Sequence, residues 1–250
     1  MLGILKNELV KVAKSKRIAI FTGIILTLCA FFGIVVVQME KTGMATDEMI
    51  QEMAGGNFPI QMLGLVSDMV LPIFATLLAC FLLIDEYNSG TLKLPILCGH
   101  SRNSIITAKM LAVISIMAYI MTMIWLGANL TSVILWGADG VIQMLGSNLL
   151  IYVQTFIAMV SWSLIMMLVA LFLKNSGIMI GIMTVILVVS SVVGSMFPSI
   201  ARYIITYYLK AFASQSGTVS YALGDMVCLS MLAIFGAAAY LRFNLMEIQK

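Results

Sequence analysis

Charged residues are scarce in this chain: Asp, Glu, Lys and Arg make up 10% of its 250 residues, whereas 62% are hydrophobic. A soluble domain has about a quarter charged residues, so the composition excludes a soluble globular protein. An integral membrane protein remains, and spans of about 20 residues each account for nearly all of its length. We therefore expect an all-α, polytopic membrane protein with a single transmembrane domain, residues 1–250, and no separate soluble domain.

The residues that build catalytic and nucleotide sites are scarce as well. The chain has one histidine, His100, and it contains no His-Glu-x-x-His, no Gly-x-Ser-x-Gly and no Gly-x-x-x-x-Gly-Lys-Ser/Thr motif. The last absence excludes ATP binding by a P-loop of this chain. We interpret His100 as a solvated polar residue, and we expect no enzymatic activity, no bound cofactor and no nucleic-acid partner.

The four cysteines form no CxxC pair, and three of them lie inside apolar runs. This distribution is typical of small core residues and not of disulfides or metal ligands. We therefore expect no metal site. The four are Cys29, Cys80, Cys98 and Cys228.

Six long apolar runs predict six membrane-spanning helices. The third and fourth are long enough to tilt or to begin outside the hydrocarbon. Because the basic start is long, the first run has full length and no small-residue cleavage site follows, we expect no cleavable signal peptide. The runs cover residues 18–37, 62–84, 106–136, 147–173, 177–196 and 219–241.

Lys and Arg are distributed unequally between the two sides of these spans. Of the 14, three (Lys41, Arg202 and Lys210) fall on one side and eleven on the other. Since Lys and Arg concentrate in cytoplasmic loops, we expect both termini and residues 85–109 in the cytoplasm, which requires an even number of spans. The eleven are Lys6, Lys11, Lys14, Lys16, Arg17, Lys93, Arg102, Lys109, Lys174, Arg242 and Lys250.

Three segments outside the spans have characters of their own. Residues 1–17 carry Leu and Val on one helical face and Lys on the other, which predicts an amphipathic helix in the inner interface, either as a topology signal alone or with a mechanical role. Residues 40–57 are acidic and predict a short solvated loop. Residues 197–217 are apolar and aromatic, and predict a helix that lies on the outer leaflet or dips into it.

The fifth span is rich in small residues. Gly177 and Gly181 have the four-residue spacing that lets helices approach closely, and Gly194 follows further along. This span is therefore our candidate for a close-packed helix interface. Methionine is abundant, with 21 residues, and either fills lipid-facing cores or lines a path for variable apolar cargo.

Two carboxylates, Asp68 and Asp225, lie near the outer ends of their predicted spans. A carboxylate inside a span can mark a proton or ion path. The alternative is an interfacial acid that is stabilised near a helix N-terminus. We favour the second interpretation because no ladder of acids accompanies the two.

Residues 85–109, here called the polar segment, separate the second and third spans and combine acidic with basic residues. An Asn-Ser-Gly sequence predicts a turn, after which residues 91–97 are apolar enough to lie along the membrane surface. Gly99 ends this stretch, and Ser101 or Asn103 is placed to cap the helix that continues into the third span. The segment predicts a short elbow that transmits force to the two spans it joins.

The polar segment contains an acidic residue, a Gly-Thr pair, a Ser-Arg pair and a lysine that enters the third span: Glu86, Gly90, Thr91, Ser101, Arg102 and Lys109. In this order they resemble the loop of the permease subunits of type-2 ABC exporters, in the branch of lantibiotic-immunity, bacitracin-resistance and toxin-peptide exporters. The basic amphipathic N-terminus and the membrane-dipping segment before the last span are similar too. The chain departs from the family at Cys98-Gly99-His100, where a proline is common.

The resemblance implies that two permeases pair, as identical or related chains, and that each docks a cytoplasmic P-loop ATPase that binds ATP and magnesium. Residues 85–105 would be the coupling loop, with Glu86 and Arg102 in contact with the ATPase. The implied cargo is an amphipathic peptide or another apolar compound, exported across a bacterial cytoplasmic membrane. The ATPase-coupling residues implied are Asp85, Glu86, Tyr87, Gly90, Thr91, Lys93, Ser101, Arg102 and Lys109.

Two other functions fit the residues. One is a membrane-anchored immunity or assembly protein that binds a peptide or partner without transporting it. The other is an ion-coupled carrier that uses Asp68 or Asp225. The polar segment itself has a simpler alternative, a solvated loop whose charges serve only solubility and topology.

Overall fold

The computed structural model describes residues 2–214 and 221–246, which form helices and short connections with no strand in these ranges. Six of the helices are long and apolar enough to cross a membrane, which confirms the predicted six spans and the all-α fold. Five of the six follow the predicted runs with shifted ends. These are α2 (Lys16–Thr42), α8 (Arg102–Trp136), α9 (Asp139–Ala170), α10 (Ser176–Met196) and α13 (Tyr221–Leu245).

The second span differs from the single run predicted over residues 62–84. The helix breaks at Met69, where φ is −135° and ψ is −44°. Pro72 explains the break, because it has no N–H and its ring clashes with the carbonyl four residues earlier, that of Asp68. The stretch long enough to span is Val70–Asn88. The elements of this region are α4 (Phe58–Asp68), α5 (Val70–Ala79), a π-helical turn (Cys80–Ile84) and α6 (Asp85–Asn88).

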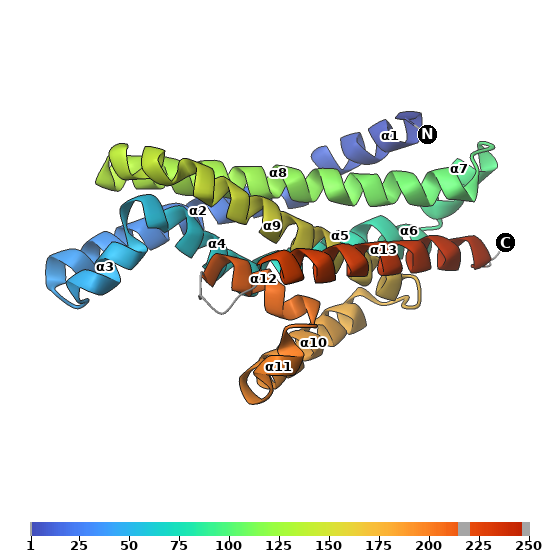
Figure 1. Cartoon of the computed structure of the whole chain (residues 1–250). Coiled ribbons are helices and arrows are strands. Elements are labelled where there is room, and N and C mark those ends of the chain that lie inside the picture. The colour runs from blue at the N-terminus through green and yellow to red at the C-terminus, as the bar shows by residue number, and fades with distance from the viewer. Residues whose placement is uncertain (1, 215–220, 247–250) are drawn as a thin grey trace.

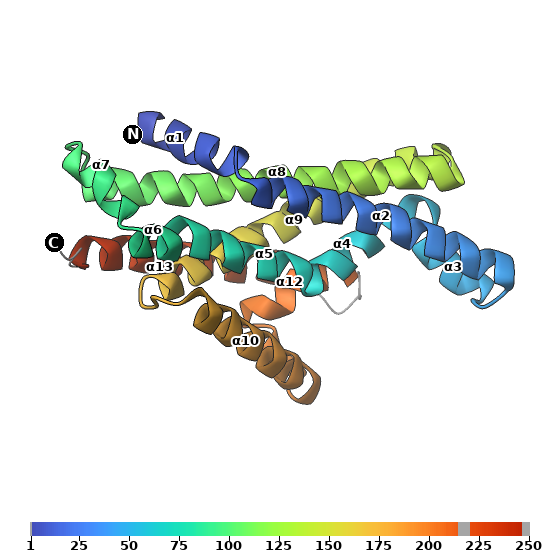
Figure 2. The ribbon, with the colours of Figure 1, turned by 180° about the vertical axis from the view of Figure 1, so that it is seen from behind.

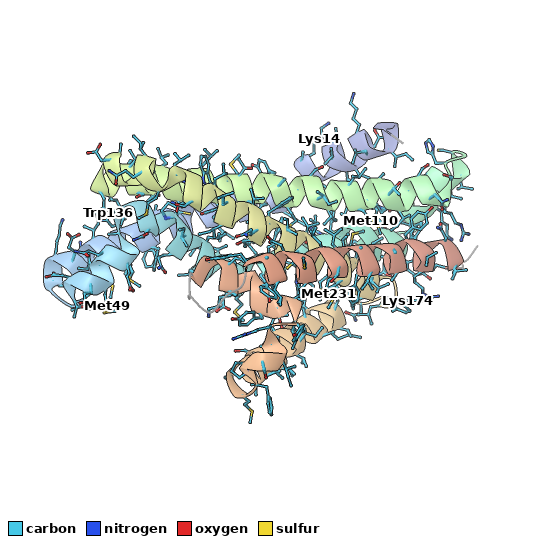
Figure 3. All side chains as sticks on the ribbon, viewed as in Figure 1. Lys14, Met49, Met110, Trp136, Lys174 and Met231 are labelled. Atoms are coloured by element: carbon cyan, nitrogen blue, oxygen red, sulfur yellow. The ribbon has the colours of Figure 1, made fainter. Side chains whose placement is uncertain are left out.

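The long helices form one bundle with both termini at the same end, where α7 (Leu94–Leu97) also lies (Figures 1 and 2). The turn between α8 and α9 lies at the other end, so Trp136 and Lys174 mark opposite ends of the bundle (Figure 3). The central helix is α9, which contacts α5, α8 and α13 and buries Trp162. Termini at one end agree with the even number of spans.

One span, α10, leans away from the bundle in both views and is the least buried of the six (Figures 1 and 2). Its side chains Val185, Val188 and Val192 are each more than half exposed. Apolar side chains in such numbers do not face water. This surface of α10 is therefore covered by lipid or by another subunit.

The connection that was predicted as a solvated loop, residues 40–57, is partly helical. It contains α3 (Asp47–Met53), which begins after Thr46, whose hydroxyl accepts a hydrogen bond from the Met49 N–H at 3.4 Å. Two acids in the first turn of α3 suit the positive end of the helix dipole. A 3-10 turn (Gly55–Asn57) leads into α4.

The apolar segment before the last span, predicted over residues 197–217, contains two helices, and its residues 215–217 lie outside the described ranges. The second helix packs against α4 and α9 and buries Tyr208, so the segment is part of the bundle and not only a surface element. Burial raises the pKa of the Tyr208 phenol, which stays neutral and donates to the Arg202 carbonyl at 2.7 Å. The two helices are α11 (Pro198–Ala201) and α12 (Ile205–Ser214).

Candidate functional site

The N-terminal helix α1 (Leu2–Ala13) packs along α8 and turns a carboxylate toward it. Its buried face carries Ile4, Glu8 and Val12. The predicted amphipathic helix is present within residues 2–13, but the face that meets the protein is centred on an acid that was not among the predicted site residues. An acid is buried in this way only when it is paired.

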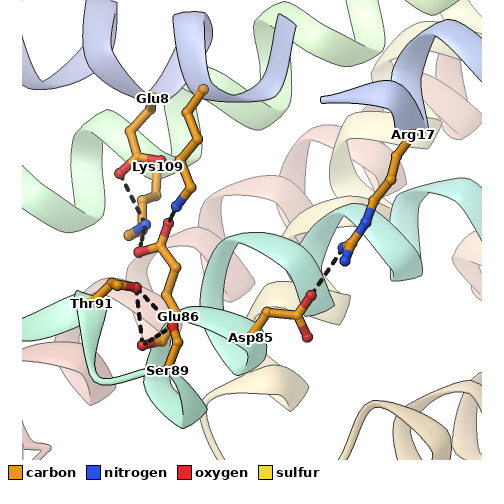
Figure 4. A network of polar contacts seen from close by, with 8 residues as sticks. Glu8, Arg17, Asp85, Glu86, Ser89, Thr91 and Lys109 are labelled. Carbon is orange, nitrogen blue, oxygen red and sulfur yellow. Dashed lines mark hydrogen bonds and ion pairs between the residues drawn. The ribbon is translucent and has the colours of Figure 1, made fainter. Parts of the chain in front are cut away.

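Lys109 of α8 provides the pairing and is itself completely buried (Figure 4). Its Nζ donates to Glu8 Oε1 at 3.1 Å and to Glu86 Oε2 at 2.7 Å, while Glu86 Oε1 accepts from Lys11. Two carboxylates and two ammonium groups thus balance in a poorly hydrated site, where an unpaired charge would cost several kcal/mol, roughly. The network joins α1, α6 and α8 at the end of the bundle that holds both termini.

A further ion pair, outside this network, joins α6 to the start of α2. Arg17 Nη1 donates to Asp85 Oδ2 at 2.9 Å, and the Ser176 hydroxyl donates to Asp85 Oδ1 at 3.4 Å. The Phe81 ring lies 4.7 Å from Arg17 Cζ and 5.4 Å from Lys11 Nζ. These distances allow cation–π attraction, so one aromatic ring supports the cations of both ion pairs.

The turn after α6 is held by local hydrogen bonds. Gly90 has φ of 70°, a left-handed conformation that favours glycine. The Ser89 and Thr91 hydroxyls donate to the Glu86 carbonyl at 3.3 and 3.4 Å and lie 2.9 Å from each other. The predicted turn is therefore present, and a 3-10 turn (Thr91–Lys93) leads from it into α7.

Apolar side chains are exposed on α7, at the tip of the bundle. Leu94 is 57% exposed and Leu97 is 80% exposed. Gly99, with φ of 83°, reverses the chain, and Ser101 caps α8 by accepting a hydrogen bond from the Ser104 N–H at 3.3 Å. The elbow expected from the sequence is thus present, with a fixed base and an apolar tip.

Two predicted coupling residues contact neighbouring elements near the end of α13. Arg102 Nη1 donates to the carbonyls of Met246 at 2.7 Å and Asn244 at 3.3 Å, which would otherwise lack partners at the end of the helix. Tyr87 is half-buried, with Lys174 Nζ 5.4 Å from the centre of its ring. The polar segment is thereby attached to the last span as well.

The predicted coupling residues differ in their burial and in their partners. Glu86 and Lys109 are buried and paired with each other, and Arg102 is bonded to α13. The implied direct contact of Glu86 and Arg102 with an ATPase stays a prediction; within this chain Glu86 pairs with Lys109, and Arg102 donates to carbonyls at the end of α13. The predicted residues that are exposed are Gly90, Thr91 and Ser101, while Asp85, Tyr87 and Lys93 are half-buried.

Three residues of the ion-pair network were not singled out from the sequence. Glu8 is the only acid among the first 17 residues, and an isolated acid in a basic helix was the available signal. Lys11 was counted for topology and as part of the polar face of the N-terminal helix, and Arg17 was counted for topology. Their partners lie 75 and 68 positions away, so spacing along the chain does not reveal the pairs.

The small residues of α10 do not form a helix interface within the described part of the chain. Gly181 and Gly194 have no neighbour within 4 Å of the place where a side chain would start, and Gly177 meets only Asn175, which caps its own helix. Gly194 lines a pocket of about 250 Å³ between α10 and α12. The close-packed interface predicted for this span therefore has no partner within these ranges.

Asp68 and Asp225 each have one hydrogen-bonding partner among the described residues. Asp68 Oδ2 lies 3.2 Å from Lys210 Nζ, and both side chains are more than half exposed. Asp225 accepts a hydrogen bond from Gln154 Nε2 at 3.3 Å. No group of three metal-ligating side chains occurs among the residues that the structure describes.

The described residues contain six helices that can span a membrane. The short exposed helix α7 lies between the second and third of them, and the buried ion pair of Glu86 with Lys109 joins the helices on either side of it. These features define a multi-pass α-helical membrane protein. Residues 4–194 match the family described as ABC-2 family transporter protein. The chain belongs to this family, and it is a permease subunit of an ABC transporter. The family implies a separate ATP-binding subunit. No curated protein matches the chain.

Proposed function

We propose that the chain is the permease of an ATP-driven exporter that moves amphipathic peptides or other apolar compounds out of a bacterial cell. The family supports coupling to an ATP-binding subunit. The resemblance of the polar segment to lantibiotic-immunity, bacitracin-resistance and toxin-peptide exporters supports the direction and the cargo. The eleven Lys and Arg residues on one side support a cytoplasmic position for both termini, in the cytoplasmic membrane.

The observation that carries this proposal is that α7 is exposed while ion pairs hold the helices on either side of it together. Leu94 and Leu97 point outward at the tip, while the contact of 2.7 Å between Glu86 and Lys109 joins the helices on either side of it. A force applied to α7 therefore moves the second and third spans together. We infer that an apolar cleft of the ATPase receives α7, and that ATP and magnesium are bound by that subunit.

A second permease, identical or related, completes the proposed exporter. Both α2 and α10 are poorly covered by the rest of the chain, and they are visible together with α5 in Figure 2. A cavity of about 370 Å³ lies between α2 and α5; its wall is mainly apolar, with Phe21, Phe74 and Leu78, and includes the ion pair of Arg17 with Asp85. Uncovered spans beside a mainly apolar cavity support a permease–permease interface along which cargo passes.

ATP-dependent transport is the decisive measurement. The permease is co-purified with the P-loop ATPase of a neighbouring gene, reconstituted in vesicles and assayed with a panel of amphipathic peptides. We expect peptide accumulation with ATP and none with an ATPase that lacks its P-loop lysine. Peptide binding without any ATP-dependent accumulation would instead identify the immunity or assembly protein.

Replacing the two outer acids distinguishes the exporter from an ion-coupled carrier. We expect Asp68→Asn and Asp225→Asn to leave transport in the same vesicles unchanged, because an exposed pair such as that of Asp68 with Lys210 contributes about 0–1 kcal/mol. The measurement is the initial rate of peptide uptake. Loss of transport in either variant, with normal ATPase binding, would favour the carrier.

Cys98 offers a test of orientation, since it is exposed whereas the other three cysteines are buried. A membrane-impermeant maleimide is expected to label the chain in inside-out vesicles and not in intact cells, because Cys98 lies in the polar segment. Cys98→Ser is the control and should remove the label. Labelling of intact cells alone would contradict the cytoplasmic position of this end.

A further inference from the structure

A cavity of about 420 Å³ lies between the polar segment, the end of α9 and the end of α13. Among the described residues its wall contains two cations, Lys174 and Arg242, and no acid. Lys174 lies at the end of the bundle that holds the C-terminus (Figure 3). The cavity is separate from the ion-pair network, whose cations Lys11 and Lys109 have carboxylate partners.

Neither cation of the cavity has a carboxylate partner among the described residues. Each lies over an aromatic ring instead: Lys174 Nζ is 5.4 Å from the centre of Tyr87, and Arg242 Cζ is 4.7 Å from that of Phe172. The Nε of Arg242 is buried without a hydrogen-bond partner in this part of the chain. Because no carboxylate of the described residues neutralises Lys174 or Arg242, the cavity favours a ligand that supplies negative charge.

The charge of the cavity indicates a negative charge on that ligand. The ends of α9 and α13 meet it at Ala170 and Leu245, and each helix C-terminus acts as about half a negative charge. Arg102 already donates to the last carbonyls of α13, so the helix ends do not cancel the two cations and the cavity stays positive. An anion such as a phosphodiester offsets this charge.

The rim of the cavity indicates that the ligand also has an apolar part. Phe172 is 62% exposed and Leu245 is 77% exposed. A free phosphate ion gains nothing from such surroundings, whereas a phospholipid places acyl chains against them. Basic pockets between spans at the membrane surface are typical of lipid headgroup sites.

We propose that this cavity binds the phosphodiester headgroup of an anionic phospholipid, with its acyl chains along Phe172 and Leu245. The Lys174 ammonium and the Arg242 guanidinium contact the phosphate. Tyr87 belongs to the polar segment and lines the same cavity, so the bound lipid joins this segment to the last span. The assignment does not depend on the cargo or the direction of transport.

Lipid retention by the purified full chain tests the site. Native mass spectrometry in detergent compares phosphatidylglycerol with phosphatidylcholine, which has no net charge. We expect the wild type to retain phosphatidylglycerol selectively and Lys174→Gln/Arg242→Gln to lose affinity by at least about tenfold, since each hydrogen bond to a charged group contributes about 1.5–3 kcal/mol. Arg242→Lys keeps the charge and should retain most of the binding.

The matched control removes two exposed cations, Lys6 of α1 and Lys14 directly after it, as Lys6→Gln/Lys14→Gln, and should bind like the wild type. Equal affinity in the cavity variant and the wild type, or an equal loss in the control, would overturn the proposal. Displacement of the lipid by millimolar inorganic phosphate would assign the site to a soluble anion instead. Glu247→Gln, outside the described residues, should not change the affinity, and a rise would show that the chain's own acid occupies the cations.

Discussion

Lys109→Met is expected to destabilise the chain by about 3–5 kcal/mol, because it leaves two buried carboxylates without their shared cation. Lys109 is completely buried, and its Nζ contacts Glu8 at 3.1 Å and Glu86 at 2.7 Å. Water cannot replace the lost partner at this depth. The measurement is the thermal unfolding of the purified permease in detergent, together with its accumulation in the membrane.

A control and a rescue variant separate this effect from the loss of one positive charge. Lys14→Met removes an exposed cation of the same end of the bundle and should change the free energy of unfolding by about 0.5 kcal/mol or less. Lys109→Met combined with Glu8→Gln and Glu86→Gln removes the unpaired charges and should recover most of the stability. Equal melting temperatures for Lys109→Met and Lys14→Met would show that the network does not hold this end together.

Leu97→Asp is expected to abolish coupling to the ATPase while the permease stays folded. Leu97 is 80% exposed at the tip of α7, so a charge there meets water in the free permease. In the proposed complex the same charge would be buried in an apolar cleft. A central contact of an interface is worth about 2 kcal/mol or more, so co-purification of the ATPase and peptide-stimulated ATP hydrolysis should both fall by more than about tenfold.

Met44→Asp is the matched control, because Met44 is 79% exposed in the connection between α2 and α3, at the opposite end of the bundle. It introduces the same charge at an equally exposed apolar site and should leave ATPase binding unchanged. Both variants should melt like the wild type. Normal coupling in Leu97→Asp, or an equal loss in Met44→Asp, would contradict docking through α7.

Two of the differences between prediction and structure have causes that are visible in the sequence. Pro72 breaks the second span by removing one N–H and crowding the carbonyl of Asp68, and the effect of proline on a helix is local. Thr46 followed by two acids is a capping signal for α3. In the second span the hydropathy of the run outweighed the proline, and in residues 40–57 the acidic composition outweighed the capping signal.

The exposure of α7 had no such signal. Leu94 and Leu97 have the composition of a stretch that lies against the membrane, and their position at the tip follows from how the two flanking helices are held. Likewise, the sequence does not show where the side chains of Glu86 and Arg102 point. Their contacts are with α1 and the end of α13, which are far away in sequence. Charge alone does not say whether a residue faces a partner protein or its own chain.

The sequence by itself determined that the chain is a membrane protein with six spans and both ends on one side. It could do so because the transfer of side chains into lipid and the bias of Lys and Arg act on each segment separately. The absence of a P-loop motif was also read directly from the sequence. The tertiary structure decided which charged residues of the polar segment pair within the chain and which can contact a partner protein. Glu8, Glu86 and Lys109 are separated by up to 101 positions and meet only because α1, α6 and α8 pack together. Once they meet, the low dielectric of the packed site makes their pairing obligatory, and the apolar tip of α7 is the part that remains exposed.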